Sequence, residues 1–153
     1  MQRKRLTYLL DILEKEVKLA KRRAEELRVV ANEVSKTARS SWSAAGERFL
    51  TQGQAQAAEE YFKRMLDLIG KIEGAVKEPT PDSVVTSCFV KLILDGREEE
   101  FYLAEEVVSI PGVKLVSKSS LLGKSLLGKK VNETFSFETV EGKKVEGKII
   151  YLG

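Results

Sequence analysis

The segment LTYLLDILEKEVKLAKRRAEELRVVANEV, residues 6–34, decides how the N-terminal half of this chain folds. Apolar or small side chains recur along it at alternating intervals of three and four residues, at Leu6, Leu10, Leu13, Val17, Ala20, Ala24, Leu27, Ala31 and Val34. Such a repeat keeps one seam of an α-helix facing a partner helix. The spacing therefore predicts a long coiled-coil helix over about residues 4–42.

A second stripe with the same alternation follows at Ala55, Ala58, Phe62, Met65, Ile69, Ile72 and Val76. It predicts a second helix over about residues 50–77, with the hairpin tip in residues 40–49. The alternative is that the stripes pair between two chains as a parallel dimer. The turn-prone tip and the matched stripes favour an antiparallel hairpin within one chain, and hence a monomeric protein.

A change of sequence character follows the hairpin. Pro79-Thr80-Pro81-Asp82 is predicted to be a linker, because two prolines stop a helix and impose extended geometry. The predicted organisation is a helical hairpin over 1–78, the linker over 79–82 and a β domain over 83–153.

The C-terminal half is rich in β-branched and aromatic residues. Strands are predicted over Ser83–Leu94, Arg97–Leu103 and Thr134–Val140, with Asp95-Gly96 and Glu141-Gly142 as turns. Phe135 and Phe137 are expected on one face of the third strand, and Val145, Ile149 and Tyr151 are expected to continue on the return strand.

A short helix is predicted over residues 120–127, with Ser119 as its N-cap and Gly128 ending it. We expect Leu122 and Leu126 to face the core and Leu121 and Lys124 to be more exposed. The fold class is therefore α+β: a coiled-coil hairpin, then a small antiparallel β domain with one short helix.

Composition limits the chemistry. The 153 residues include one cysteine, Cys88, and no histidine. This excludes a disulfide framework, multi-cysteine metal sites, histidine zinc sites and nucleophiles activated by histidine. Cys88 is expected to be a small buried hydrophobe, and no cofactor is expected.

The net charge of +3 is unevenly distributed: residues 1–78 carry 16 Lys and Arg against 12 Asp and Glu, and residues 79–153 carry 10 against 11. A mixed-sign pattern is typical of solvated helix faces, so Arg3-Lys4-Arg5 and Arg22-Arg23 are expected to be solvated. The alternative is that they attract the phosphates of a nucleic acid or of a nucleic-acid-containing partner. Without a membrane-length apolar run or a secretory signal, we expect a cytoplasmic protein with no membrane contact.

The segment SKSSLLGKSLLGKKV, residues 117–131, resembles the Gre transcript-cleavage factor family, whose C-terminal domain carries a stretch close to SPLGRALLGKKVGD. Residues 126–131 match outright, and Ser119-Ser120-Leu121 is placed at the Ser-Pro-Leu positions. Asn132-Glu133 replaces the usual Gly-Asp.

The resemblance implies a C-terminal domain of FKBP-like fold that docks on the rim of the secondary channel of bacterial RNA polymerase. The coiled coil would enter the pore, close to RNA and DNA. An acidic pair at its tip helps Gre factors to hold a second Mg²⁺ that promotes hydrolysis of backtracked RNA, with the polymerase supplying the catalytic site. The residues that this implies for docking are Ser119, Ser120, Leu121, Lys124, Gly128 and Lys129.

The tip departs from the family pattern, which reads roughly Gly-Asp-x-x-Glu-Asn. In one register Glu47 replaces the Asp and Leu50 replaces the Glu; in another, Arg48 and Thr51 occupy the two acidic positions. Either way the pair is incomplete, although Glu47 remains a candidate to contact a shared Mg²⁺ or to be a simple helix N-terminal carboxylate. Trp42 is expected to pack across the hairpin end or to contact a partner. The tip residues expected to approach the polymerase active centre are Trp42, Gly46, Glu47, Arg48, Leu50 and Thr51.

These patterns favour a non-enzymatic, Gre-like regulator of bacterial RNA polymerase that does not stimulate RNA cleavage efficiently. Two alternatives remain open. An FKBP-like peptidyl-prolyl isomerase or chaperone would need an aromatic-lined pocket, and a structural coiled-coil module would have no polymerase partner.

Overall fold

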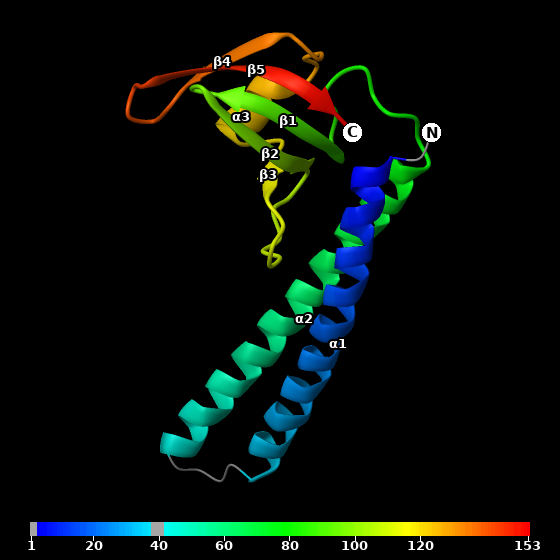
Figure 1. Cartoon of the computed structure of the whole chain (residues 1–153). Helices are drawn as coiled ribbons and strands as arrows, with labels where there is room; N and C mark the ends of the chain where they lie inside the picture. The colour runs from blue at the N-terminus through cyan, green and yellow to red at the C-terminus, as the bar shows by residue number, and fades with distance from the viewer. Residues whose placement is uncertain (1–2, 38–41) are drawn as a thin grey trace. The chain divides into compact units, whose positions relative to one another are not determined.

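The structure is a computed structural model that describes residues 3–37 and 42–153, with the backbone alone at Thr37 and residues 42–45. Two long helices precede a sheet that carries one short helix (Figure 1). The elements are α1 (Lys4–Thr37), α2 (Trp42–Val76), β1 (Cys88–Leu94), β2 (Arg97–Ala104), β3 (Leu115–Ser117), α3 (Leu121–Leu126), β4 (Thr134–Glu138) and β5 (Lys144–Leu152).

The helix α2 begins at Trp42, so residues 42–49, predicted to form the connection, are helical instead. Alanine, glutamate and arginine dominate this stretch and favour helix, while an isolated glycine such as Gly46 costs only about 1 kcal/mol and does not break one. The other residues of the predicted tip, 40 and 41, lie outside the described residues, as do residues 38 and 39, which were predicted to be helical.

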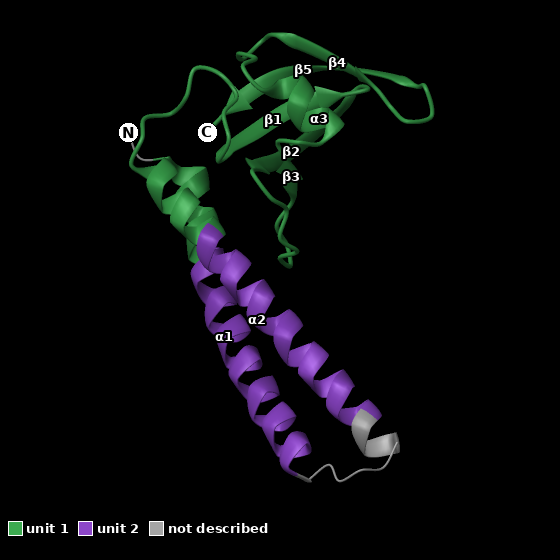
Figure 2. Cartoon of the chain, turned by 180° about the vertical axis from the view of Figure 1, so that it is seen from behind, with its two compact units in different colours: residues 1–11, 68–153 green, residues 12–67 purple. Residues whose placement is uncertain are grey.

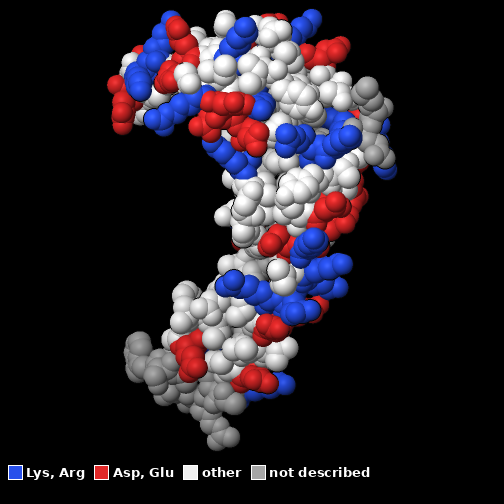
Figure 3. All heavy atoms as spheres, viewed as in Figure 1, with Lys and Arg blue, Asp and Glu red and all other residues white. Residues whose placement is uncertain are grey.

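The chain divides into two compact units, residues 12–67 and residues 1–11 with 68–153 (Figure 2). In the first unit, small residues of the predicted stripes form the buried seam of the coiled coil, among them Ala20, Ala24, Ala31 and Ala55. The outer face carries both signs of charge, as Figure 3 shows along the hairpin. Arg28 and Glu59 form an ion pair across the two helices there.

The second unit contains a five-stranded sheet in the order β3-β2-β1-β5-β4. Three of its pairings are antiparallel, as predicted, but β3 pairs with β2 in parallel. The sheet is therefore mixed, with one parallel pairing added to the predicted antiparallel strands. The strand β3 has only three residues, too few for its alternation to be recognised in the sequence.

The strand β1 begins at Cys88 rather than at the predicted Ser83. The reason is local: Ser87 has a φ of 64°, in the left-handed region that an extended strand does not contain. Similarly, β4 ends at Glu138, two residues before the predicted end at Val140.

A register shift in β5 changes which side chain faces the core. Lys91 pairs with Tyr151 while Leu92 pairs with Ile149, so Ile150 is an extra residue at a β-bulge. As a result Leu152 is buried and Tyr151 is 47% exposed. Val145, Ile149 and Tyr151 all lie in β5, as predicted for the return strand, and the bulge leaves Tyr151 on the exposed face.

The core of this unit joins the sheet to α3 through ten buried side chains: Val84, Cys88, Val90, Leu92, Phe101, Leu103, Leu126, Phe135, Ile149 and Leu152. Cys88 is fully buried, as predicted, and its burial raises the pKa of its thiol. Leu122 packs at the margin of the core, while Leu121 is 47% exposed, as expected.

Arg3 is not solvated, in contrast to the prediction, because its side chain is only 4% exposed. Its guanidinium donates to the main-chain oxygens of Ala75 at 2.9 Å, Ser87 at 3.5 Å and Gly153 at 2.8 Å. Ala75 lies in the last turn of α2, whose final carbonyls have no partner within the helix and favour a nearby cation. Within the described part of the chain, no helix is long and apolar enough to cross a membrane.

Candidate partner-binding surface

The turn before α3 fixes where that helix begins. The Ser120 hydroxyl accepts a hydrogen bond from the Gly123 N–H at 3.0 Å and donates one to the Ser117 oxygen at 2.7 Å. Ser120 is therefore the N-cap, and the prediction of Ser119 was wrong by one residue. If the Ser of the Ser-Pro-Leu pattern is aligned with Ser120 instead of Ser119, the family pattern matches the spacing of residues 120–126 without a gap.

Gly123 allows α3 to approach β3 closely. A Cβ atom at this position would lie 2.1 Å from the Ser117 oxygen and 2.9 Å from the Lys118 Cα. Both are main-chain atoms and cannot move aside as a flexible side chain can. The glycine of the motif is therefore required by packing between the turn and the helix.

The C-terminal side of α3 is tied to the segment before β1. Gly128 has a φ of 83° and follows the helix, as predicted for the residue that ends it. Its N–H donates to the Val84 oxygen at 3.0 Å, and the Val84 N–H donates to the Lys129 oxygen at 2.8 Å. These bonds hold the main chain of the lysine-rich turn on the domain.

This ordered frame presents apolar and basic side chains together. Leu121 is 47% exposed, and Leu127 and Val131 are each 40% exposed. Lys124 and Lys130 are exposed, and Lys129 is half-buried. We call the six side chains the α3 patch: Leu121, Lys124, Leu127, Lys129, Lys130 and Val131.

Among the described residues, none of the three lysines of the α3 patch forms an ion pair with a carboxylate. The Lys118 Nζ, just before the patch, lies 3.6 Å from the Glu105 Oε1. The Oε2 of the same carboxylate pairs with the Lys71 Nζ at 2.7 Å. The arrangement therefore suits a partner surface that combines apolar contact with negative charge.

The residues predicted to dock differ in what they can offer a partner. Ser119, Leu121, Lys124 and Gly128 are exposed, and Lys129 is half-buried. Ser120 is half-buried and its hydroxyl is engaged in the cap, so its role at this surface is to shape the helix terminus.

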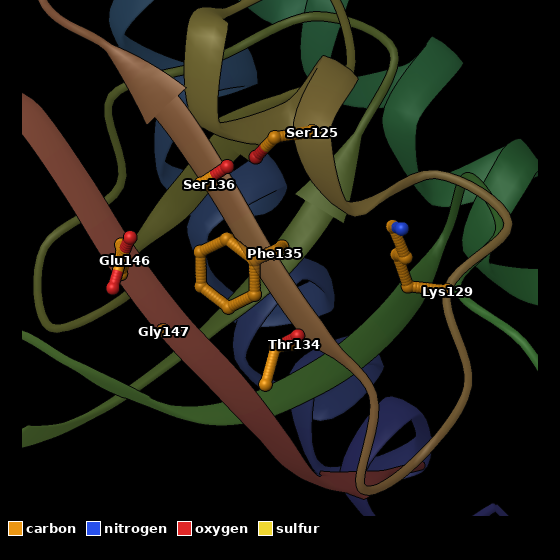
Figure 4. Close-up of a pocket in the computed structure, with 7 residues that line it drawn as sticks. All are labelled: Ser125, Lys129, Thr134, Phe135, Ser136, Glu146 and Gly147. Carbon is orange, nitrogen blue, oxygen red and sulfur yellow. The ribbon is translucent and has the colours of Figure 1, made fainter.

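An open pocket of about 360 Å³ lies beside α3. In Figure 4 the hydroxyls of Ser125 and Ser136 point toward one another, and Lys129 and Glu146 lie on opposite sides of Phe135. The sequence did not single out Ser125, Thr134, Ser136, Glu146 or Gly147, because polar residues on a strand and beside a helix carry no distinctive spacing.

The aromatic side chains of the β domain belong mainly to packing. Phe89 and Phe101 are each 2% exposed and Phe135 is 4% exposed. Phe135 is the only aromatic residue that lines the pocket beside α3. The pocket beside α3 is therefore not the aromatic-lined pocket that the isomerase alternative requires.

At the other candidate site, Gly46, Glu47, Arg48, Leu50 and Thr51 lie in the first turns of α2. Glu47 is exposed, Leu50 is 60% exposed and the neighbouring Phe49 is 82% exposed. The Thr51 hydroxyl donates to the Arg48 oxygen at 3.1 Å, which leaves it bound to its own helix. The prediction for the Trp42 side chain lies outside the described residues.

A metal would find few ligands at this end of the hairpin. In the described residues, no group of three or more His, Cys, Asp and Glu side chains is placed to hold a metal ion. Glu47 supplies one carboxylate, and the side chains at positions 48 and 50 are a cation and an alkyl group. Glu47 could contribute one oxygen to a metal held by another protein, but it could not hold the metal itself.

Comparison with known proteins gives one family match. Residues 78–152 match the family model described as the C-terminal domain of transcription elongation factor GreA/GreB. No curated protein sequence matches the chain.

Several solved structures are similar over longer stretches. GreA factor homolog 1 (Gfh1) of Thermus thermophilus is 18% identical, with 94% of each chain covered and a TM-score of 0.39. Thermus aquaticus Gfh1 is 20% identical, with 92% of this chain and 90% of that chain covered and a TM-score of 0.40. GreA/GreB from Nitrosomonas europaea is 19% identical, with 57% of this chain and 78% of that chain covered and a TM-score of 0.39.

Proposed function

Because residues 78–152 place this chain in the GreA/GreB family of transcription elongation factors, we propose that it regulates bacterial RNA polymerase from the secondary channel. The C-terminal domain docks at the channel rim, and the helical hairpin enters the pore. The protein acts as a monomer in the cytoplasm and modulates the polymerase without catalysing a reaction of its own.

The observation that carries docking is the α3 patch within the family-matched segment. Its main chain is fixed by the Ser120 cap and by the hydrogen bonds between Val84, Gly128 and Lys129. Its side chains remain exposed, and its lysines have no carboxylate partner within the described residues. A preorganised surface loses little conformational entropy on binding, so its apolar and charged contacts contribute more of their free energy to affinity.

The composition of the tip supports regulation without efficient RNA cleavage. A second Mg²⁺ at a polymerase active centre needs several oxygen ligands, and one carboxylate beside Arg48 is a poor set. In this proposal the hairpin occupies the pore and excludes factors that carry a complete acidic pair. Exposed Phe49 and Leu50 make the tip more apolar than such a pair would.

The test is a binding titration of the fluorescently labelled full chain with purified bacterial core RNA polymerase. We expect saturable binding at micromolar concentration or tighter, and displacement by a cleavage-active Gre factor. The double variant Leu121→Glu/Lys124→Glu replaces one apolar and one basic side chain of the α3 patch by acidic ones. It should weaken binding by at least about tenfold, because disrupting an apolar or a charged interaction at an interface costs about 1 kcal/mol or more.

Lys148→Glu is the control for the lysine reversal, since it makes the same charge change as Lys124→Glu alone at an exposed position in β5. It should leave the affinity within a factor of about two, as expected for a charge outside the interface. Absence of binding by the unmodified chain would favour a structural coiled-coil module instead. Binding that a Gre factor does not displace would place the interaction outside the secondary channel.

A further inference from the structure

Arg3 lies where four segments of the chain meet. The segments are the beginning of α1, the last turn of α2, the turn before β1 and the end of β5, and the guanidinium donates to main-chain oxygens in the last three. These acceptors are 72, 84 and 150 residues away in the sequence. All four segments belong to the same compact unit, drawn in green in Figure 2.

Burying a guanidinium is costly, so the geometry around it is informative. The side chain is 4% exposed, and its Nε has no hydrogen-bond partner. Placing a charged group in such surroundings costs several kcal/mol unless hydrogen bonds compensate. The planar guanidinium suits this place because it offers several donors in a fixed arrangement, whereas a lysine offers one ammonium.

The hydrogen bonds of Arg3 connect residues that lie on both sides of the Pro79–Asp82 segment in the sequence. Ala75 lies before this segment, and Ser87 and Gly153 lie after it. A proline-containing connection of this kind could serve as a hinge between the helices and the sheet. The guanidinium crosses that connection with hydrogen bonds to both sides.

Three further interactions also connect residues before the Pro79–Asp82 segment with residues after it. Lys71, in α2, pairs with Glu105 at 2.7 Å. The Tyr102 hydroxyl donates to the Arg5 oxygen at 3.1 Å, and the Arg5 guanidinium lies 4.8 Å from the centroid of the Phe89 ring. The charged and hydroxyl groups in these three interactions are exposed or half-buried, whereas the Arg3 side chain is buried. Removal of the Arg3 guanidinium therefore leaves acceptors that water cannot easily reach.

We infer that Arg3 is a positioning residue that joins residues 4–11 and 68–76, the base of the hairpin, to the β sheet as one rigid body, so that Pro79–Asp82 is not a free hinge. What this rigid connection means for polymerase binding rests on the proposed function. The base of the hairpin and the α3 patch would then already be aligned when they reach the enzyme. The structural inference itself does not depend on which partner is bound.

The test compares Arg3→Met, Arg3→Lys and the adjacent control Lys4→Met in the full-length, isotope-labelled chain. Residual dipolar couplings are measured for amides of residues 4–11, 69–76, β1, β2 and β5. In the unmodified chain and in Lys4→Met, one alignment tensor should fit both the helical and the strand amides. In Arg3→Met the two sets should need different tensors, while each set keeps its own internal geometry.

Amide hydrogen exchange provides a second readout, because the Phe89 and Gly153 main chains hydrogen-bond to each other at 3.0 and 2.9 Å beside the guanidinium. The Gly153 amide should exchange about tenfold faster in Arg3→Met and by a smaller factor in Arg3→Lys, since local opening becomes easier. If Arg3→Met does not fold, Arg3→Lys carries the comparison of tensors.

A single tensor in both Arg3 variants, with exchange unchanged, would overturn the inference. Loss of the shared tensor together with loss of polymerase binding would support both proposals. Loss of the shared tensor in a chain that never bound polymerase would support the role of Arg3 and contradict the proposed function.

Discussion

Glu47 and Leu50 lie three residues apart in the first turns of α2, and both side chains are exposed. At that spacing two side chains share one face of a helix. A second carboxylate at position 50 would therefore face the same direction as the first. The position where a paired acid would complete the tip holds an alkyl side chain instead.

Leu50→Glu should restore part of the missing metal-binding capacity. We expect measurable release of short 3′ RNA fragments from a stalled, backtracked elongation complex in the presence of Mg²⁺, because two carboxylates on one face can share the cation. Phe49→Glu adds the same charge on a different face and should give no gain. If Leu50→Glu binds polymerase normally and remains inactive, Glu47 and Leu50 are not the two acidic positions.

Gly123→Ala should destabilise the C-terminal domain. Its Cβ would lie 2.1 Å from the Ser117 oxygen, and relieving such overpacking costs about 1–3 kcal/mol. Gly53→Ala is the matched control, because no atom lies within 4 Å of that Cβ and alanine favours helix by about 1 kcal/mol. Urea unfolding of the two variants should therefore shift in opposite directions. An unchanged midpoint for Gly123→Ala would show that α3 can move away from β3.

The elements that follow a simple period were predictable. The stripes at Ala20, Ala24 and Ala55 identified the helices, and Asp95-Gly96 identified the turn between β1 and β2. What failed was set by one residue at a time. The left-handed Ser87 displaced the start of β1, and the extra Ile150 gives β5 a bulge that no sequence period indicates.

The candidate sites show the same division. The motif located the α3 segment, and the expected burial of Leu126 and exposure of Leu121 were confirmed. The hydrogen bonds that made Ser120 the cap depend on the path of β3, which the sequence did not predict. Arg3 was missed because a basic residue beside Lys4 and Arg5 has no sequence feature that distinguishes a buried guanidinium from a solvated one.

Cys88 should make the domain sensitive to alkaline pH. Burial raises the pKa of the thiol above its unfolded value, so folding favours the neutral form. The stabilisation is fully present below the ordinary thiol pKa and is lost as the pH rises toward the folded pKa. Between pH 7 and pH 10 the chain should lose more of its free energy of unfolding than Cys88→Ala does, measured by urea unfolding. Equal losses in both chains would contradict this assignment.

Glu105 should contribute to acid sensitivity. A hydrogen bond from Lys71, then the charges of Lys118 and Lys71, lower the pKa of this carboxyl. A lowered pKa stabilises the fold above the unfolded pKa, and the contribution disappears as the pH falls through the folded value. Glu105→Gln should therefore lower the melting temperature slightly at pH 7 and not at pH 3. Glu106→Gln, the exposed neighbour, is the control, and an equal effect of the two would argue against the ion pairs.

The most direct test of the proposed function is a cleavage titration on one sample: a backtracked elongation complex with labelled RNA, Mg²⁺ and a cleavage-active Gre factor. We expect that the chain alone releases no short 3′ fragments rapidly and that increasing amounts of it suppress release by the Gre factor. Rapid fragment release by the chain alone would contradict the proposal that the chain regulates polymerase without stimulating RNA cleavage. Unchanged release by the Gre factor at saturating chain would contradict occupation of the secondary channel.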